Sequence, residues 1–100
     1  MSKVIFSMQY EIKPEEKDEY IQSLKELKML QKGEGIESYS VYEVKGKANV
    51  FEETIVFSSE DAFDNYDDAS NERTELLNSK IEELKVPKTT KYNTLIELSI

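Results

Sequence analysis

The sequence contains no cysteine, no histidine and no tryptophan. Without cysteine there can be no disulfide, no thiolate nucleophile and no cysteine-based zinc or iron–sulfur site. Without histidine there can be no Ser-His-Asp or Cys-His arrangement and no imidazole ligand for haem, and the commonest general base near neutral pH is missing. These absences exclude several of the commonest catalytic and metal-binding arrangements.

Positive charge is also scarce. The chain has 13 Lys and Arg against 21 Asp and Glu, a net charge of −8, and Arg73 is its single arginine. Affinity for a phosphate backbone comes chiefly from clustered Lys and Arg, so this composition argues against nucleic acid as a partner. No apolar run approaches the roughly 20 residues that a membrane span needs, and the N-terminus enters a strand pattern without a signal-peptide core. We therefore expect a cytoplasmic protein with no membrane partner.

What is present is typical of one globular domain over residues 1–100. Hydrophobic residues make up 38% and charged residues 34% of the 100 residues, and the apolar positions are periodic rather than scattered. A chain of this size buries only one core and is marginally stable alone. Burial against a second copy would supplement that core.

The segment Lys3 to Ile12, KVIFSMQYEI, predicts the central strand of a sheet. Side chains alternate between the two faces of a strand. One face is entirely apolar or aromatic and carries Val4, Phe6, Met8, Tyr10 and Ile12. The other face carries Ile5, Ser7, Gln9 and Glu11.

The remaining pattern predicts a helix, two strands, a broken helical region and a last strand. The first helix begins near Pro14 and continues to about Gln31, because proline suits the first helical position and an apolar stripe follows it. The strands are expected at Ile36–Lys45, Val50–Ser58 and Thr89–Ile100, with a hairpin turn at Gly46–Asn49.

The second helical region starts with a cap at Ser58-Ser59, and its apolar stripe fails between Asp67 and Glu75. Asn71 could cap a second helical piece, which Val86-Pro87 ends. The order strand, helix, strand, strand, helix, strand predicts an α+β, ferredoxin-like βαββαβ fold. Two helices would cover one face of a four-stranded antiparallel sheet, and a homodimer packing sheet on sheet would cover the other.

Four stretches of the chain resemble the dimeric α+β barrel superfamily, specifically the antibiotic biosynthesis monooxygenase domain. They are KVIFSMQYEI, KPEEKDEYIQSL, EVKGKANVFEETIVFSS and EDAFDNYDDASNERTELL. The resemblance implies a homodimeric barrel with a small pocket in each subunit between the helices and the sheet. Some members oxidise quinol-like aromatics with oxygen and no cofactor. Others degrade haem with a histidine ligand and an assisting Trp, neither of which this chain has, so we expect no cofactor.

The resemblance does not assign catalytic residues, and the candidates come from the strands. Glu11 and Glu53 are candidate general bases toward a phenol or enol, and Tyr10 is a candidate oxyanion donor. Candidate substrate-binding residues, chosen for their polar groups beside apolar surface, are Gln9, Tyr42, Tyr66 and Tyr92. The alternative for the tyrosines is packing in the core or an interface. The alternative for the two glutamates is solvent exposure or a cross-strand pair with Lys45, Lys47 or Lys91.

The acidic residues of the second helical region do not predict a metal site. Asp61, Asp64, Asp67 and Asp68 lack the alternating ligands, turn glycine and distal glutamate of a calcium loop. A solvated helix face explains them, and we expect no metal.

Three readings of the function follow from these observations. The first is a homodimer that binds a small apolar or aromatic molecule and acts as a cofactor-independent monooxygenase on a phenolic or quinol-like substrate. The second is a non-catalytic ligand-sensing or structural dimer, which the lack of histidine and cysteine favours. A third reading is a ferredoxin-like module that binds another protein through its free sheet face.

Overall fold

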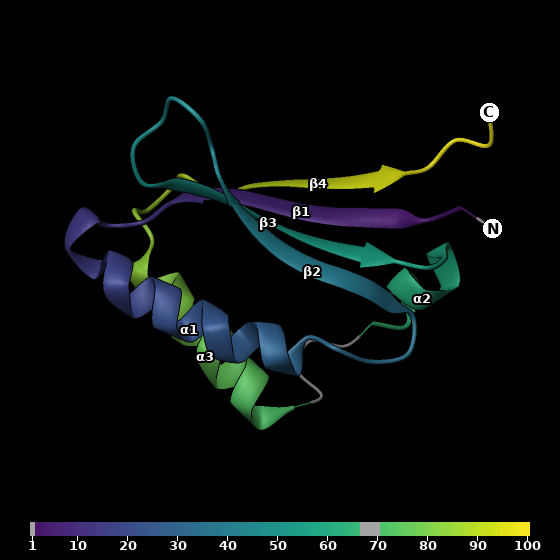
Figure 1. The fold of residues 1–100 in the computed structure, drawn as a ribbon, viewed down its shortest axis with the longest axis horizontal. Coiled ribbons are helices and arrows are strands. Elements are labelled where there is room, and N and C mark those ends of the chain that lie inside the picture. The colour runs from purple at the N-terminus through teal and green to yellow at the C-terminus, as the bar shows by residue number, and fades with distance from the viewer. Residues whose placement is uncertain (1, 67–70) are drawn as a thin grey trace.

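The computed structural model describes residues 2–66 and 71–100 (Figure 1). The elements in chain order are β1 (Val4–Glu11), η1 (Pro14–Glu16), α1 (Lys17–Leu30), β2 (Ile36–Glu43), β3 (Val50–Phe57), α2 (Glu60–Asp64), α3 (Glu72–Leu84) and β4 (Lys91–Ile96). No helix among these residues is both long enough and apolar enough to cross a membrane.

The four strands form one antiparallel sheet in the order β2-β3-β1-β4. The central β1 pairs with β3 on one side and with β4 on the other, and its Val4 lies opposite both Phe57 and Ile96. The predicted ferredoxin-like α+β fold is confirmed. The first strand of the sequence is an inner strand, as predicted, because it is hydrogen-bonded to β3 on one side and to β4 on the other.

Helices α1 and α3 lie side by side on one face of the sheet (Figure 1). The predicted apolar face of β1 points toward them, since Val4, Tyr10 and Ile12 are almost completely buried. The rest of the buried core comes from both helices and from β2 and β3, namely Tyr20, Leu24, Leu27, Tyr39, Phe51, Ile55, Phe57, Leu77, Ile81 and Leu84. Burial of these apolar side chains holds the helices on the sheet.

The start of the first helix differs from the prediction of one continuous helix from Pro14. A short 3₁₀ turn forms at Pro14–Glu16, and α1 begins at Lys17. Glu16 has φ −104° and ψ 7°, which is outside helical geometry and separates the two pieces. Proline still occupies the first position of the turn, where its missing N–H costs nothing.

The last strand is shorter than the predicted Thr89–Ile100 and covers only Lys91–Ile96. Ile96 lies opposite Val4, the first residue of β1, so the partner strand ends there. One further backbone bond joins Glu97 N–H to Lys3 O at 2.9 Å. A strand cannot continue beyond its partner, although its alternating pattern does. The predicted strands at Ile36–Lys45 and Val50–Ser58 are likewise shortened at their C-terminal ends.

The second helical region is divided, as predicted. Ser59 caps α2 by accepting a hydrogen bond from Ala62 N–H at 3.1 Å. Asn71 caps α3, and its Oδ1 accepts bonds from the N–H groups of Arg73 and Thr74 at 2.8 and 3.2 Å. Of the acidic residues expected on a solvated face, Asp61 and Asp64 are exposed, whereas 67 and 68 lie outside the described residues.

We expect Asn71→Ala to lower the free energy of unfolding by about 1 kcal/mol, because two N–H groups of α3 lose their acceptor. Asn71→Asp keeps an acceptor at the same place and should stay within a few tenths of a kcal/mol of the parent chain. Urea unfolding followed by circular dichroism measures both. Equal losses in the two variants would contradict the capping role.

Candidate functional site

Glu53 is a carboxylic acid in the middle of the core-facing side of β3. Phe51, Ile55 and Phe57 occupy the same face, because side chains alternate along the strand. This face is covered by the helices, and only 4% of the surface of Glu53 is exposed. The alternative that Glu53 is solvent-exposed is therefore wrong, and among the described residues no ion pair joins Glu53 to Lys45, Lys47 or Lys91.

The partners of Glu53 are tyrosines from the two neighbouring strands. The Tyr39 hydroxyl donates a hydrogen bond to Glu53 Oε1 at 3.3 Å. The Tyr10 hydroxyl also interacts with the carboxyl, and it shares a 2.7 Å hydrogen bond with the Tyr20 hydroxyl. The rings of Tyr10 and Tyr20 meet edge to face, with their centroids 5.9 Å apart. Strands β1 and β2 and helix α1 thus converge on one buried carboxyl.

A single ammonium group accompanies this cluster. Lys85 directly follows α3 and is only 8% exposed. Its Nζ bonds Glu82 Oε2 at 2.8 Å and lies 4.3 Å from the centroid of the Tyr10 ring. An isolated bridge between Lys85 and Ile12 holds this part of the chain at the end of β1. The sequence offered no signal for Lys85, because a lysine at a helix end is usually solvated.

Burial decides the protonation of these groups. It raises the pKa of Glu53, while the Tyr10 hydroxyl, the charge of Lys85 and the Tyr39 hydroxyl act in the opposite direction. Burial, followed by the nearby Glu53, raises the pKa of Tyr10 and of Tyr39. Burial also raises the pKa of Tyr20. The three phenols therefore stay protonated at neutral pH and can act only as neutral hydrogen-bonding groups.

A cavity of about 240 Å³ opens against Glu53 between the sheet and α3. Its lining is formed by Phe6, Met8, Gln31, Glu53, Ile55, Tyr66, Asn78, Ile81, Glu82, Lys85 and Tyr92. The Tyr66 hydroxyl donates to Gln31 Oε1 at 3.0 Å, and the rings of Phe6 and Tyr92 stack with centroids 6.1 Å apart. An apolar wall with a few convergent polar groups is typical of a small-molecule site.

The structure brings together only some of the residues expected from the sequence. Glu53, Tyr66 and Tyr92 line the cavity, and Tyr10 lies beside it under Lys85. The remaining three lie on the opposite face of the sheet and do not line the cavity: Gln9, Glu11 and Tyr42. Side chains alternate between the two faces of a strand, so Gln9 and Glu11 on β1 and Tyr42 on β2 point away from the helices.

The arrangement combines three chemical properties. The carboxyl can accept or donate a proton, the ammonium can stabilise a developing anion, and the surrounding aromatic rings favour a flat apolar molecule. Among the described residues, no group of three or more acidic side chains is placed to hold a metal ion. The Glu53 carboxyl and the Lys85 ammonium together have the groups needed for a proton transfer beside a positive charge.

The fold is shared with solved structures of low sequence identity. One, named antibiotic biosynthesis monooxygenase, has a TM-score of 0.70 at 20% identity, covering 100% of this chain and 99% of its own. A conserved protein from Methanosarcina mazei Go1 has a TM-score of 0.79 at 20% identity, with 95% and 92% covered. A conserved protein of unknown function from Bacteroides thetaiotaomicron VPI-5482, described as a possible oxidoreductase, reaches 0.77 at 16%, with 96% and 98% covered.

No protein-family model matches the sequence, and no curated protein matches it significantly. The chain thus has the fold of the antibiotic biosynthesis monooxygenase proteins, as the resemblance of its sequence predicts.

We expect Glu53→Gln to remove one component of the pH dependence of stability. Between the usual glutamate pKa of 4.5 and the raised value, the folded chain binds more protons than the unfolded chain. The free energy of unfolding therefore falls as pH rises through this window, by up to about 1.4 kcal/mol per pH unit. The Gln variant lacks this fall.

The measurement is urea unfolding of both proteins from pH 4 to 9, taken as a difference at each pH. Glu52→Gln is the matched control, because Glu52 precedes Glu53 on β3 and faces away from the helices. Its pH profile should follow the parent chain. Parallel profiles of the parent chain and Glu53→Gln would contradict the raised pKa.

Proposed function

We propose that this chain, which has the fold of the antibiotic biosynthesis monooxygenase proteins, binds a small apolar or aromatic molecule in the cavity against Glu53. The observation that supports this most directly is the buried Glu53 carboxyl in the cavity wall, with the Lys85 ammonium in the same wall. Buried charged groups cost stability unless they are paired, so their retention at a cavity favours a function there.

The chemistry we propose is cofactor-independent oxidation of a phenolic or quinol-like substrate. Glu53 removes the phenol proton, and Lys85 stabilises the anion that forms. The substrate anion then donates an electron to oxygen. Tyr92 lines the same cavity and contacts the substrate oxygen in this proposal. The Tyr10 hydroxyl is instead bonded to Tyr20, and the Tyr66 hydroxyl donates to Gln31. Tyr10 and Tyr39 act by positioning the carboxyl.

Glu53→Gln should lower kcat/KM for oxidation of a naphthohydroquinone by roughly 10²- to 10⁴-fold, the usual contribution of a general base. Oxygen uptake under conditions that suppress spontaneous oxidation measures the rate. Glu52→Gln, on the other face of the same strand, should retain the parent rate. Equal rates in all three proteins would remove Glu53 from the mechanism.

A second candidate is a non-catalytic ligand-sensing or structural dimer. Its structural form is favoured by the cavity volume of about 240 Å³, which is below the roughly 300 Å³ at the lower end of ligand pockets. The hydroxyls of Tyr10, Tyr20 and Tyr39 form hydrogen bonds within the protein, to one another or to Glu53, which also fits a structural role. Saturable binding of the naphthohydroquinone with no oxygen uptake would select this candidate over the enzyme.

We also propose that the protein is a homodimer. Within residues 2–66 and 71–100, helices α1 and α3 lie on one face of the sheet only (Figure 1). On the other face Leu95 of β4 is 54% exposed. Leu95 shares the helix-free face of the sheet with Ile5 and, across β1, with Val56. A continuous apolar row on an exposed sheet is a typical interaction surface.

Leu95→Glu should convert the dimer to a monomer at micromolar concentration, because it would bury a charge in the interface. Native mass spectrometry and light scattering measure the subunit number. Leu76→Glu is the control, since Leu76 is similarly exposed but lies on α3. A monomeric parent chain, or a dimer unaffected by Leu95→Glu, would overturn this interface.

A further inference from the structure

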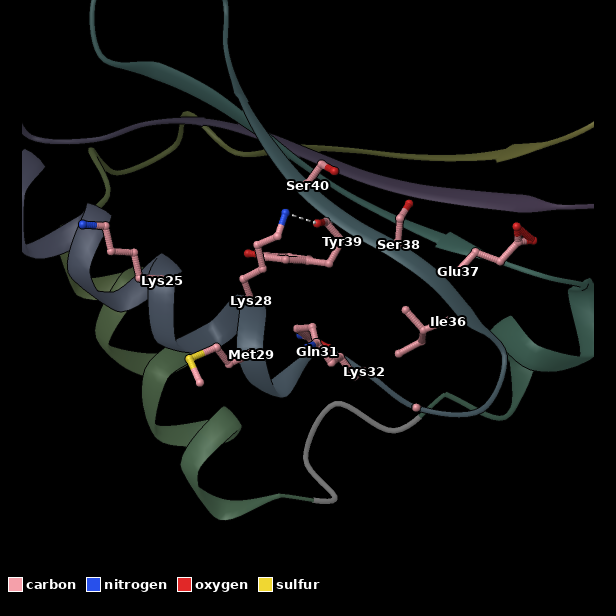
Figure 2. A pocket seen from close by; sticks show the side chains of 11 residues that line it. Lys25, Lys28, Met29, Gln31, Lys32, Ile36, Glu37, Ser38, Tyr39 and Ser40 are labelled. Atoms are coloured by element: carbon pink, nitrogen blue, oxygen red, sulfur yellow. Dashed lines mark hydrogen bonds between the residues drawn. The ribbon is translucent and has the colours of Figure 1, made fainter.

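A second and larger hollow lies outside the Glu53 cavity, between the C-terminal half of α1 and the edge strand β2 (Figure 2). We call it the α1–β2 groove. Its volume is about 740 Å³, and its lining is formed by Lys25, Lys28, Met29, Gln31, Lys32, Gly33, Ile36, Glu37, Ser38, Tyr39 and Ser40. Nothing in the proposed oxidation uses this groove.

The groove is positively charged on a strongly acidic protein. Three lysines line it against one carboxylate, a lining charge of +2, whereas the whole chain carries −8. The carboxylate, Glu37, is itself paired with Lys3 at 3.0 Å. Within the described residues, none of the three lysines forms an ion pair with an acidic side chain. The groove therefore has cationic groups without carboxylate partners.

The three lysines are spaced along one side of α1 and its end. Lys28 points toward β2, and its Nζ donates to the Tyr39 carbonyl oxygen at 3.3 Å (Figure 2). This bond fixes one ammonium at the floor of the groove and leaves two of its N–H groups for another acceptor. Lys25 precedes and Lys32 follows Lys28 in the sequence, and both of these lysines are exposed.

The same groove carries apolar surface and hydroxyl groups. Met29 is 73% exposed, and Ile36 is partly exposed at the start of β2. Ser38 and Ser40 add hydroxyls along β2, which is an edge strand of the sheet that the described residues form. A ligand that fits this lining needs both an anionic group and an apolar body.

We propose that the α1–β2 groove binds a small amphiphilic anion, with its charged head among Lys25, Lys28 and Lys32 and its apolar body against Met29 and Ile36. Charge complementarity selects an anion, because a cation would meet a lining of the same sign. This site is separate from the Glu53 cavity. Tyr39 lies between them: its carbonyl faces Lys28, and its hydroxyl faces Glu53.

The test uses anilinonaphthalene sulfonate, which combines an aromatic body with one negative charge, in a fluorescence titration and in two-dimensional amide NMR. We expect shifts confined to the amides of residues 25–33 and 36–40. Lys25→Gln/Lys32→Gln should weaken binding roughly three- to tenfold, as expected for two exposed ion pairs. The Lys28 contact with β2 stays intact in this variant.

The matched control is Lys45→Gln/Lys47→Gln, which makes the same change in net charge at exposed positions of the β2–β3 connection. It should bind as tightly as the parent chain. N-phenylnaphthylamine, the same ring system without the sulfonate, should bind more weakly than the sulfonate.

Five results would overturn the proposal. The first four are equal loss of affinity in both double variants, no loss in either, equally tight binding of the uncharged probe, and NMR shifts at Phe6, Ile81 and Tyr92 instead of the groove. The fourth result would place the probe in the Glu53 cavity. A groove occupied by a second copy of the chain would leave the groove amides unshifted and would overturn the proposal as well.

Discussion

The structure depends on the pairing of β1 with a strand on each side. Because β1 is hydrogen-bonded to both β3 and β4, its helix-facing side chains form the middle row of the sheet. That row lies under α1 and α3 and supplies Val4 and Tyr10 to the core. The same pairing places Glu53 directly opposite Met8, so the acidic residue lies inside the core rather than at a rim. Glu53 is buried because the register between β1 and β3 places it on the helix-covered face, in the middle of both strands.

A carboxyl in this position needs compensation, because desolvation of an unpaired charge costs several kcal/mol. The compensation comes from three different elements: the hydroxyl of Tyr39 on β2, the hydroxyl of Tyr10 on β1, and Lys85 after α3. An apolar residue at position 53 would avoid the cost altogether. The fold instead has a polar cluster whose tyrosine side is closed by hydrogen bonds and whose other side borders the cavity.

The Glu53 cavity and the α1–β2 groove are linked through residues of β2 and of the end of α1. Tyr39 contacts Glu53 with its side chain and Lys28 with its backbone, and Gln31 lines both hollows. A ligand in the α1–β2 groove would therefore touch the elements that position Glu53. Strand β4 lies at the opposite edge of the sheet from β2, so the proposed dimer surface on β4 and the groove are at separate edges.

The sequence by itself determined the order and kind of the elements, the apolar face of β1 and the cap at Asn71, since these depend on periodicity and on hydrogen bonds between near neighbours. It also named Glu53, together with Glu11, as a candidate general base. Alternation along β1 already placed Gln9 and Glu11 on the face away from Tyr10. Only the tertiary structure decided that Glu53 is buried beside Tyr10 and Tyr39, that β4 stops at Ile96, and that Lys85 reaches Tyr10. Each of these depends on strand register or on contacts between residues distant in the chain, which local patterns do not encode.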